Sequence, residues 1–560
     1  MSAAPEAANP RRDSTGQATA SSGDTPKTAP APIDTELLDV LVVGGGVCGT
    51  ALLFELARYT DLGRIALVER YDQLALVNSK ATNNSQTIHC GDIETNYTLE
   101  KALRVKRTAE MIVHYAELLD SASRERCVFR TPKMVLAVGD KECAVLRERF
   151  ARFSPHFPAM ELLEKQQIAE WEPAVALDRG QLRAEQLLAI GIRRTYTAVD
   201  YGQLSESFVQ QAQAAISAAN AAAVDAVKLQ QVFAGRPPME GPAIYEPANP
   251  ELDQPCIDQS SIAQTYLEQP PSEQRRLDLY LGTTVERIQP EGELFRVTLA
   301  PTPGCQGGSG QPSQLLARHV VVNAGAHSLL MAQRMGFGME YSCLPVAGSF
   351  YFTPDLLQGK VYTVQNDKLP FAAIHGDPDV GAAGKTRFGP TALLLPMLER
   401  YKPASFWQFL QVLRLDWAVF SVLWQLFRIA DIRNYILKNI LFELPWLRRW
   451  LFLADARKIV PGMTIDQLSF AEGYGGVRPQ LIDKRQRKLI LGEASIEAMP
   501  GLVFNVTPSP GGTCCLGNAH RDLEAIVKRL DCGFDRSGLQ RELYGETELD
   551  SAAKQVVVAG

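Results

Sequence analysis

The stretch that decides the fold reads DVLVVGGGVCGTA and runs from Asp39 to Ala51. A short apolar run ends in glycines and continues into an apolar segment with helical character. The glycines have the spacing Gly44-x-Gly46-x-x-Gly49 directly after a predicted strand. In a dinucleotide-binding turn the first glycine permits the tight turn, the second lets the backbone approach a pyrophosphate, and the third lets helix and strand pack closely. The phosphates then contact N–H groups at the start of the helix.

The residues that follow agree with this interpretation. A helical stretch from Thr50 to Tyr59 leads into a second predicted strand, Arg64–Val68, which ends at Glu69. An acid at the tip of the second strand is placed to bind ribose hydroxyls. The alternative is a glycine turn in an ordinary βαβ unit, but strand, helix, glycines and acid agree on a nucleotide. Glu69 argues against a 2′-phosphate, so FAD or NAD fits better than NADP.

Composition describes a globular chain of several domains. The 560 residues are 46% hydrophobic and 21% charged, and a net charge of −6 gives no general attraction to nucleic acid. Ten cysteines are scattered without the CxxC spacing typical of metal sites, so we expect no metal and a reducing cytoplasm. Outside the glycine motif no uncharged apolar stretch reaches spanning length. Residues 1–35 are predicted to be a disordered extension, because Arg11-Arg12 is followed by no apolar signal region.

The predicted fold class is α/β, with a Rossmann-like FAD-binding domain, a second mixed-sheet substrate domain and a helical, apolar insertion. A buried strand near residues 319–322 is expected to return to the first sheet and to end at the Ala324-Gly325 turn beside the nucleotide. Both domains are predicted to be discontinuous. The predicted boundaries are 1–35 for the extension, 36–115 for the first FAD-binding part, 116–190 for the first substrate part, 191–335 for the second FAD-binding part with an insertion at about 230–275, 336–470 for the second substrate part with an apolar helical region at 403–455, 471–535 for the C-terminal FAD-binding part, and 536–560 for a tail.

Five segments, taken in chain order, resemble the malate:quinone oxidoreductase family, whose members have the glycine/D-amino-acid oxidase fold. The resemblance implies FAD-dependent oxidation of (S)-malate to oxaloacetate, a step of the tricarboxylic acid cycle, with electrons passed to membrane quinone. It also implies a cytoplasmic protein that is peripheral to the inner face of the membrane. Glu170–Pro173 and Phe388–Pro390 match as well. The five segments are Gly44–Glu69, Asn83–Thr98, Thr131–Met134, Ala198–Leu204 and Ser509–Thr513.

Two histidines are candidates for the base that oxidation of a 2-hydroxy acid needs. His89 follows a polar stretch of small residues expected beside the flavin, and neutral imidazole has a pKa near the working pH. The alternative for His89 is a histidine satisfied by backbone groups. His375 matches a histidine-containing family segment and could bind substrate instead. The family continues that segment with an acid and then an arginine, whereas Asp377-Pro378-Asp379 follows here without a nearby arginine.

Cations are expected to hold the substrate carboxylates. Arg478 precedes the C-terminal strands, and its fork of donors suits a carboxylate or the flavin carbonyl. Its alternative is a solvated surface arginine. Arg387 and Lys133 are weaker candidates for the same task, and we expect at most one of them to act.

The predicted cofactor site combines residues from both ends of the chain. Gly511, Gly512 and Thr513 precede the last predicted helix, where backbone N–H groups can bind the pyrimidine edge of the flavin. Their alternative role is a plain helix cap. The full set of predicted cofactor-binding residues is Gly44, Gly46, Gly49, Glu69, Asn84, Ser85, Ala324, Gly325, Gly511, Gly512 and Thr513.

A helical, Trp-rich region from Phe406 to Phe452 suggests contact with a membrane surface. Five of the six tryptophans lie between Trp407 and Trp450, and basic residues outnumber acidic ones there. The longest uncharged run, Trp417–Phe427, is too short to span a bilayer. The alternative is a helical subdomain whose aromatic residues fill its own core.

Two other functions stay open at this point. A 2-hydroxyglutarate oxidase or dehydrogenase has the same fold, and the segment Ser85–His89 leans towards that family. A non-catalytic FAD-holding membrane protein would use the apolar helices as a partner surface and His89 only for packing.

Overall fold

The glycine-rich stretch joins the central strand of an eight-stranded sheet to its first helix. The computed structural model describes residues 37–234, 274–365, 374–490, 492–508 and 510–546. Strand β1 (Leu37–Val43) is apolar and almost wholly buried, and α1 (Val47–Tyr59) follows it directly. The strand order is β10-β2-β1-β13-β12-β11, with β24 beside the second half of β13 and β23 beside β24. The other strands are β2 (Arg64–Val68), β10 (Arg276–Tyr280), β11 (Thr283–Glu291), β12 (Leu294–Pro301), β13 (Gln314–Val322), β23 (Ala494–Met499) and β24 (Leu502–Val506).

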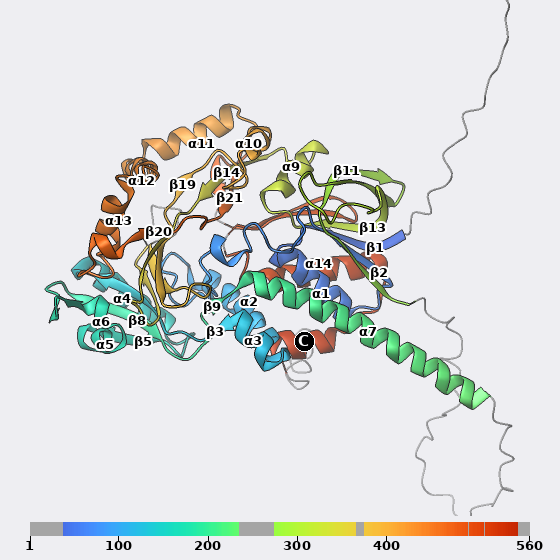
Figure 1. Cartoon of the computed structure of the whole chain (residues 1–560), viewed down its shortest axis with the longest axis horizontal. Helices are drawn as coiled ribbons and strands as arrows, with labels where there is room; N and C mark the ends of the chain where they lie inside the picture. The colour runs from blue at the N-terminus through green and yellow to red at the C-terminus, as the bar shows by residue number, and fades with distance from the viewer. Residues whose placement is uncertain (1–36, 235–273, 366–373, 491, 509, 547–560) are drawn as a thin grey trace, which may run out of the picture. The chain divides into compact units, whose positions relative to one another are not determined.

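The core of this sheet is parallel, as a doubly wound nucleotide fold requires. Strand β1 pairs in parallel with β2 and β13, and β13 pairs in parallel with β24. Buried residues of α1 pack on one face, where they share a hydrophobic core with neighbouring helices, while β11, β12 and α9 cover the other (Figure 1). The helices that contribute to these two cores are α2 (Leu99–Leu118), α7 (Tyr201–Ala234), α9 (Ala326–Arg334), α14 (Cys515–Leu530) and α15 (Arg536–Tyr544).

A second eight-stranded sheet carries the substrate-domain segments. Its order is β20-β15-β18-β17-β16-β4-β8-β5, and every neighbouring pair is antiparallel except β16 with β4. The strands are β4 (Lys133–Val138), β5 (Glu161–Glu164), β8 (Leu187–Ile192), β15 (Tyr351–Pro354), β16 (Lys360–Thr363), β17 (His375–Pro378), β18 (Lys385–Gly389) and β20 (Ser469–Phe470).

A four-stranded antiparallel sheet, β19-β14-β21-β22, stands beside a run of four helices. Figure 1 shows these helices following one another along one edge of the molecule, away from α1 and α14. The strands are β14 (Tyr341–Ala347), β19 (Leu393–Leu394), β21 (Val477–Asp483) and β22 (Lys488–Ile490), and the helices are α10 (Ser405–Leu413), α11 (Trp417–Arg428), α12 (Ala430–Leu441) and α13 (Arg448–Ala456).

Short elements complete the described chain. They are α3 (Ser121–Cys127), α4 (Asp140–Phe153), α5 (Lys165–Trp171), α6 (Pro173–Ala176), the 3₁₀ turns η1 (Ala81–Asn83) and η2 (Ile465–Gln467), and the strands β3 (Val128–Phe129), β6 (Leu177–Asp178), β7 (Gln181–Leu182) and β9 (Ala198–Val199). Among them, α4 packs on β4 and β8 of the second sheet, β3 pairs with β9, and β6 pairs with β7.

The mixed α/β fold class is confirmed, and so are the return of β13 to the first sheet and the helical region 406–452. Three local predictions were wrong. The sequence predicts one helix over residues 161–171, which form a strand and then a helix, and one strand over residues 344–353, which divide into two strands of different sheets. The tail predicted at 536–560 begins later, because buried Leu539 and Leu543 fix α15 against the core.

Domain boundaries stay predictions, since the described residues after Glu36 group as one compact unit. The 1–35 extension and residues 235–273 of the insertion lie outside the described residues. Within the described ranges, no helix has the length and apolarity to cross a bilayer.

Candidate functional site

One cleft joins the two glycine turns that lie far apart in the sequence. Gly44 and Gly46 line it near the first sheet, and Gly511 and Gly512 line it at the start of the C-terminal helix region. Residues of β14, β21 and the loop after β2 complete its wall. A single extended cleft between both turns is the arrangement that an extended dinucleotide cofactor needs.

The N-terminal turn has room only for glycine at two positions. Gly44 has φ +111°, and a Cβ there would lie 2.5 Å from the carbonyl oxygen of Asn323. A Cβ on Gly49 would lie 1.9 Å from the carbonyl oxygen of Gly44, so Gly49 packs beneath the turn and does not line the cleft. Gly46 precedes α1, lines the cleft and provides no side-chain cap. The N–H of Val47, the first of α1, donates to the hydroxyl of Ser79 at 3.0 Å, so the N–H groups that follow it are the ones open to a ligand.

Glu69 lies where the ribose-binding acid is expected. One carboxylate oxygen accepts a hydrogen bond of 2.6 Å from the N–H of Gly45, and the other accepts one of 3.0 Å from Tyr71. Burial raises the pKa of Glu69, and these two hydrogen bonds partly offset that effect. Its carboxylate both fixes the glycine turn and borders the cleft.

The predicted residues at the middle of the cleft all line it. Ala324 and Gly325 follow β13, and Asn84 and Ser85 follow η1. The Asn84 side chain donates to the carbonyl oxygens of Asn78 and Lys80 and accepts from the N–H of Gln86. The side chain of Asn84 therefore shapes the loop that lines the cleft.

The C-terminal glycine turn is fixed against the segment that carries His89. The Thr513 hydroxyl accepts a hydrogen bond of 3.1 Å from the N–H of His89 and lies 3.1 Å from the Tyr201 hydroxyl. A Cβ on Gly512 would lie 2.8 Å from the Tyr201 ring, so only glycine allows this approach. The two segments share one wall of the cleft.

His89 forms a pair with Glu94, a residue that the sequence did not single out. His89 lines the cleft, and its Nδ1 lies 2.9 Å from a carboxylate oxygen of buried Glu94. Burial acts to raise the pKa of Glu94, but the hydrogen bond and charge of His89 outweigh it and lower that pKa. Because an ionised carboxylate only accepts, Nδ1 carries the proton that points to Glu94, and in the neutral ring Nε2 then keeps its lone pair. This is the tautomer that a general base needs.

Arg478 is one of two arginines that line the cleft, and the other, Arg70, pairs with Glu399 at 2.7 Å. Arg478 lies on β21. Burial lowers its pKa, and the charges of Tyr97 and Tyr435 partly offset this. Among the described residues, the Arg478 side chain has no ion pair or hydrogen bond. A partly desolvated guanidinium with unused donors is suited to bind a carboxylate.

His375 lies outside the cleft lining. It is buried on β17, its Nδ1 is 2.6 Å from an oxygen of Asp377, and its ring stacks on Tyr362 with centroids 4.4 Å apart. Burial lowers the pKa of His375, so the neutral form is favoured. Its catalytic role stays a prediction, and the structure does not bring it to the other candidates.

The arginine that the sequence lacked after Asp379 comes from the neighbouring strand. Arg387 on β18 is fully buried and lies 3.3 Å from a carboxylate oxygen of Asp379. Lys360 on β16 lies 3.5 Å from Asp377 in the same layer. The antiparallel register of β17 and β18 thus brings together an acid and an arginine that are not close in the sequence.

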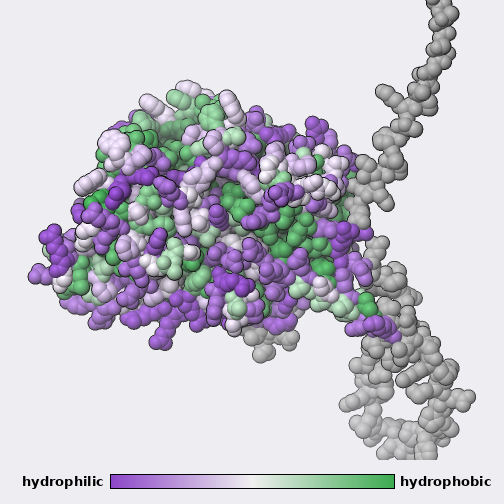
Figure 2. Space-filling view, in the orientation of Figure 1, coloured by the Kyte–Doolittle hydropathy of each residue, from purple (hydrophilic) through white to green (hydrophobic). Residues whose placement is uncertain are grey.

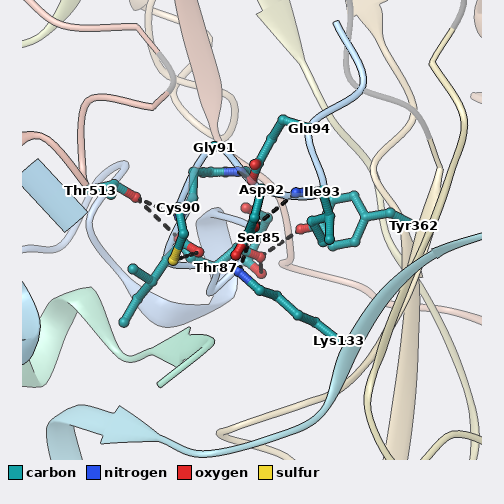
Figure 3. Close-up of polar contacts among 12 residues, drawn as sticks. Ser85, Thr87, Cys90, Gly91, Asp92, Ile93, Glu94, Lys133, Tyr362 and Thr513 are labelled. Atoms are coloured by element: carbon teal, nitrogen blue, oxygen red, sulfur yellow. Dashed lines mark hydrogen bonds and ion pairs between the residues drawn. The ribbon is translucent and has the colours of Figure 1, made fainter. Parts of the chain in front are cut away.

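The sequence also gave no sign of the contacts that connect the second sheet to the cleft. Figure 3 shows Tyr362 and Lys133 reaching from this sheet towards the segment 85–94. The Tyr362 hydroxyl is 2.7 Å from the hydroxyl of Thr87, which lines the cleft, and Lys133 donates to Asp92 at 2.8 Å. Burial acts to lower the pKa of Lys133, but the charge of Asp92 outweighs it, and the pKa is raised. Lys133 is therefore a cation that is already paired.

Comparison with known proteins places the chain in a family. A family model described as malate:quinone oxidoreductase matches residues 36–234. A probable malate:quinone oxidoreductase from Campylobacter jejuni is 42% identical over 90% of this chain and 98% of the relative. A malate:quinone oxidoreductase from Helicobacter pylori is 38% identical over 91% of this chain and 98% of the relative.

Solved structures share the fold at low identity. A glycerophosphate oxidase from Mycoplasma pneumoniae, solved with FAD bound, has a TM-score of 0.52 and 17% identity over 88% of this chain and 95% of that one. A glycine oxidase from Geobacillus kaustophilus has a TM-score of 0.52 and 15% identity over 88% of this chain and 96% of that one. The chain therefore has the fold of these two solved oxidases. The chain belongs to the malate:quinone oxidoreductase family, which confirms the resemblance.

Proposed function

We propose that this chain oxidises (S)-malate to oxaloacetate with FAD and passes the electrons to a quinone. The observation that carries the proposal is the single cleft bordered by both glycine turns, His89 and Arg478. The family membership supports it, because the relatives named malate:quinone oxidoreductase match over almost their whole length.

The residues around the cleft fit an extended FAD. The open start of α1 at Gly46 would hold the pyrophosphate, Glu69 the ribose, and the backbone at Gly512 and Thr513 the pyrimidine edge. The fit is tested by the glycine positions, where added side chains would collide with backbone or with the Tyr201 ring. Bound FAD would supply the two-electron acceptor for the hydride that leaves C2 of the substrate.

His89 is the base in this proposal. Its Nε2 accepts the hydroxyl proton of malate while the C2–H bond breaks with its electron pair and a carbonyl forms. Glu94 stabilises the imidazolium that results and holds the ring in the required tautomer. Glu94 is a positioning residue, since it acts through His89.

Arg478 binds a substrate carboxylate in this proposal. Its donors are unused among the described residues, and partial burial strengthens a charge-assisted pair. Fixing the carboxylate orients C2 towards the cofactor and its hydroxyl towards His89. His375 and Arg387 are buried on β17 and β18 and do not line the cleft.

The acceptor and location are proposed from the family. A lipid-soluble quinone lies in a bilayer, so we place the chain at the inner face of the membrane as a cytoplasmic, peripheral protein. The described helices include no span. The aromatic helices α10–α13 provide a surface for that contact.

A substrate comparison tests the proposal. Purified protein should turn over (S)-malate with a soluble quinone, and 2-hydroxyglutarate much more slowly. His89→Ala should lower kcat for malate by about a hundredfold or more, and Glu94→Gln by less, with a shifted pH profile. Lys106→Ala, at a partly exposed position of α2 outside the cleft lining, is the control and should leave kcat unchanged.

Two outcomes would overturn it. Equal or faster turnover of the five-carbon acid would assign the chain to 2-hydroxyglutarate chemistry. Redox activity that survives both His89→Ala and Arg478→Ala would favour a non-catalytic FAD-holding protein.

A further inference from the structure

Helices α10–α13 leave an unusual number of large aromatic side chains in solvent. The only tryptophan outside the region from Ser405 to Ala456, Trp171, is 7% exposed and packs in the core of the second sheet. Single exposed apolar residues are ordinary, but a contiguous group of this size marks an interaction surface. The exposed fractions are 67% for Trp407, 73% for Trp417, 53% for Trp424, 72% for Trp446 and 65% for Trp450.

Helix α11 shows that these rings do not fill a local core. It buries only Val419 and Val422, which pack with β14 and β21. On its outer side Trp417, Phe420 and Trp424 form a stacked row, with successive ring centroids 5.4 and 6.3 Å apart. Figure 2 shows pale and green side chains gathered over α10 and α11 at the top of the molecule. The rings thus form a continuous outward-facing ridge.

The charge around this ridge is positive, although the whole chain is acidic. Between Ser405 and Ala456, the outer bounds of α10–α13, there are six basic residues and four acidic ones, against a net charge of −6 for the chain, and Lys438 and Asp455 of this group pair with each other. Two of the other acids also have partners: Asp416 lies 3.1 Å from Lys484 and caps α11, and Glu443 lies 3.4 Å from Arg400. Arg414 and Arg428 are exposed at the two ends of α11. Their field attracts an anionic surface.

We propose that the outer face of α10–α13 binds an anionic lipid bilayer, with its tryptophan rings at headgroup level and the helices parallel to the membrane plane. The proposal rests on the proposed function for its biological meaning, but its physical basis is this surface. Tryptophan is amphipathic and favours the interface between headgroups and chains. Helix α11 has 12 residues and spans about 18 Å, too short to cross the hydrocarbon layer, so it lies in the interface.

The same surface lies close to the cleft. Tyr435 of α12 packs on Val346 and Ala392, and these two residues also line the cleft. The side chain of Asn439 on α12 accepts a hydrogen bond of 2.7 Å from the N–H of Ala392. One helix therefore separates the lipid-facing side from the cofactor cleft. A quinone held in the bilayer would approach the cleft from the α12 side.

Vesicle binding tests the proposal with the full chain. Wild-type protein should co-sediment with vesicles of phosphatidylcholine mixed with phosphatidylglycerol, and about tenfold less with phosphatidylcholine alone. The double variant Trp417→Ala/Trp424→Ala should bind the mixed vesicles about tenfold more weakly or worse. Val145→Ala/Leu182→Ala, at two exposed apolar positions elsewhere, is the matched control and should bind like wild type.

Activity measurements separate this proposal from the function. The double tryptophan variant should lose most malate oxidation with a long-chain quinone in vesicles and keep wild-type rates with a water-soluble dye acceptor. Unchanged vesicle binding would overturn the proposal. So would a wild-type dimer that the double variant abolishes, because a second copy would then cover the face. If wild type failed to oxidise malate with the dye yet bound vesicles, the proposed function would fail and the docking surface would stand.

Discussion

Helices α1 and α11 are apolar helices of nearly equal length that lie in opposite surroundings. Of the 13 residues of α1, 11 are buried, whereas α11 buries two of its 12. Phe54 of α1 is 1% exposed and Phe420 of α11 is 46% exposed. An apolar composition therefore does not determine whether a helix is buried or exposed. The neighbours decide it: α1 packs between other helices and the first sheet, and α11 contacts the four-stranded sheet by one narrow stripe.

The two helices also begin differently. Asp416 caps α11 by accepting a hydrogen bond of 2.9 Å from the N–H of Val419, but α1 begins at Gly46 without a side-chain cap. At α1 the N–H of Val47 donates at 3.0 Å to the hydroxyl of Ser79, a residue of the loop after β2, whereas α11 is capped by the residue that directly precedes it. In this account the N–H groups that follow Val47 are the ones left for the cofactor.

The largest contrast should come from removing one ring from each helix. Phe54 packs against Tyr59, Tyr115 and Phe208, so Phe54→Ala leaves a cavity and should lower the free energy of unfolding by about 3–5 kcal/mol. Phe420→Ala should change it by less than about 0.5 kcal/mol. Denaturant unfolding in detergent-free buffer measures both. Similar losses for the two variants would mean that α11 is packed in solution.

Substitution of Gly49 tests how tightly the glycine turn is packed on α1. Gly49→Ala places a methyl group 1.9 Å from the carbonyl oxygen of Gly44, and such overpacking costs about 1–3 kcal/mol. It should also shift Gly44 and Gly46, so the purified variant should carry little flavin. Gly492→Ala is the control, since no atom lies within 4 Å of its added Cβ. Flavin content per chain and Tm report both effects, and a fully flavin-loaded Gly49→Ala protein would contradict the packing argument.

Glu55 gives α1 a pH dependence that α11 lacks. Its carboxyl is fully buried with neither oxygen hydrogen-bonded among the described residues, and burial, helped by the charge of Asp522, raises its pKa well above the usual value. Below the unfolded pKa of about 4.3 both states are protonated. Above it the unfolded chain releases a proton that the folded chain keeps, so the free energy of unfolding falls by about 1.4 kcal/mol per pH unit until the raised folded pKa is reached.

The variant Glu55→Gln removes this contribution. As pH rises from about 5 to 8, the free energy of unfolding of wild type should fall relative to that of the variant. Near pH 4 the difference between the two proteins should level off at its smallest value. Urea unfolding at several pH values gives the difference directly. A difference that stays constant over this range would mean that the Glu55 pKa is ordinary in the folded state.

The smallest effect concerns the cap of α11. Asp416→Ala removes the hydrogen bond to the N–H of Val419 and should cost about 1 kcal/mol, felt mainly as faster amide exchange in the first turn of α11. Amide exchange in α1 should not change. Mass-spectrometric exchange resolves the two helices, and equal acceleration in both would show that α11 is coupled to the core.

Local patterns in the sequence predicted the parts of the site that depend on short spacing. The glycine turn, Glu69 and the Gly511-Gly512 pair were found because each needs particular residue types at adjacent positions. Glu94 was missed, although it lies only five residues after His89, because nothing in the sequence shows that the chain folds back between them. The one indication that the sequence offered was an acid in the same polar loop, a few residues after the histidine.

Contacts that depend on register between strands could not be predicted. The pairing of Arg387 with Asp379 follows from the antiparallel alignment of β17 and β18, and a shift of one residue would move both side chains to other faces. The same holds for Tyr362, which meets Thr87 only because β16 lies beside β4. The sequence also could not show that the aromatic rings of α11 are exposed, because the same spacing of apolar residues is found in buried helices.

The central claim is that the cleft joining Gly46 to Gly512 holds a flavin that malate reduces. Anaerobic titration of the purified protein with (S)-malate, followed by flavin absorbance, tests this most directly. The account predicts that malate bleaches the bound flavin, and that His89→Ala bleaches about a hundredfold more slowly with the same flavin content. A chain that purifies without flavin, or one whose flavin is bleached by 2-hydroxyglutarate and not by malate, would contradict it.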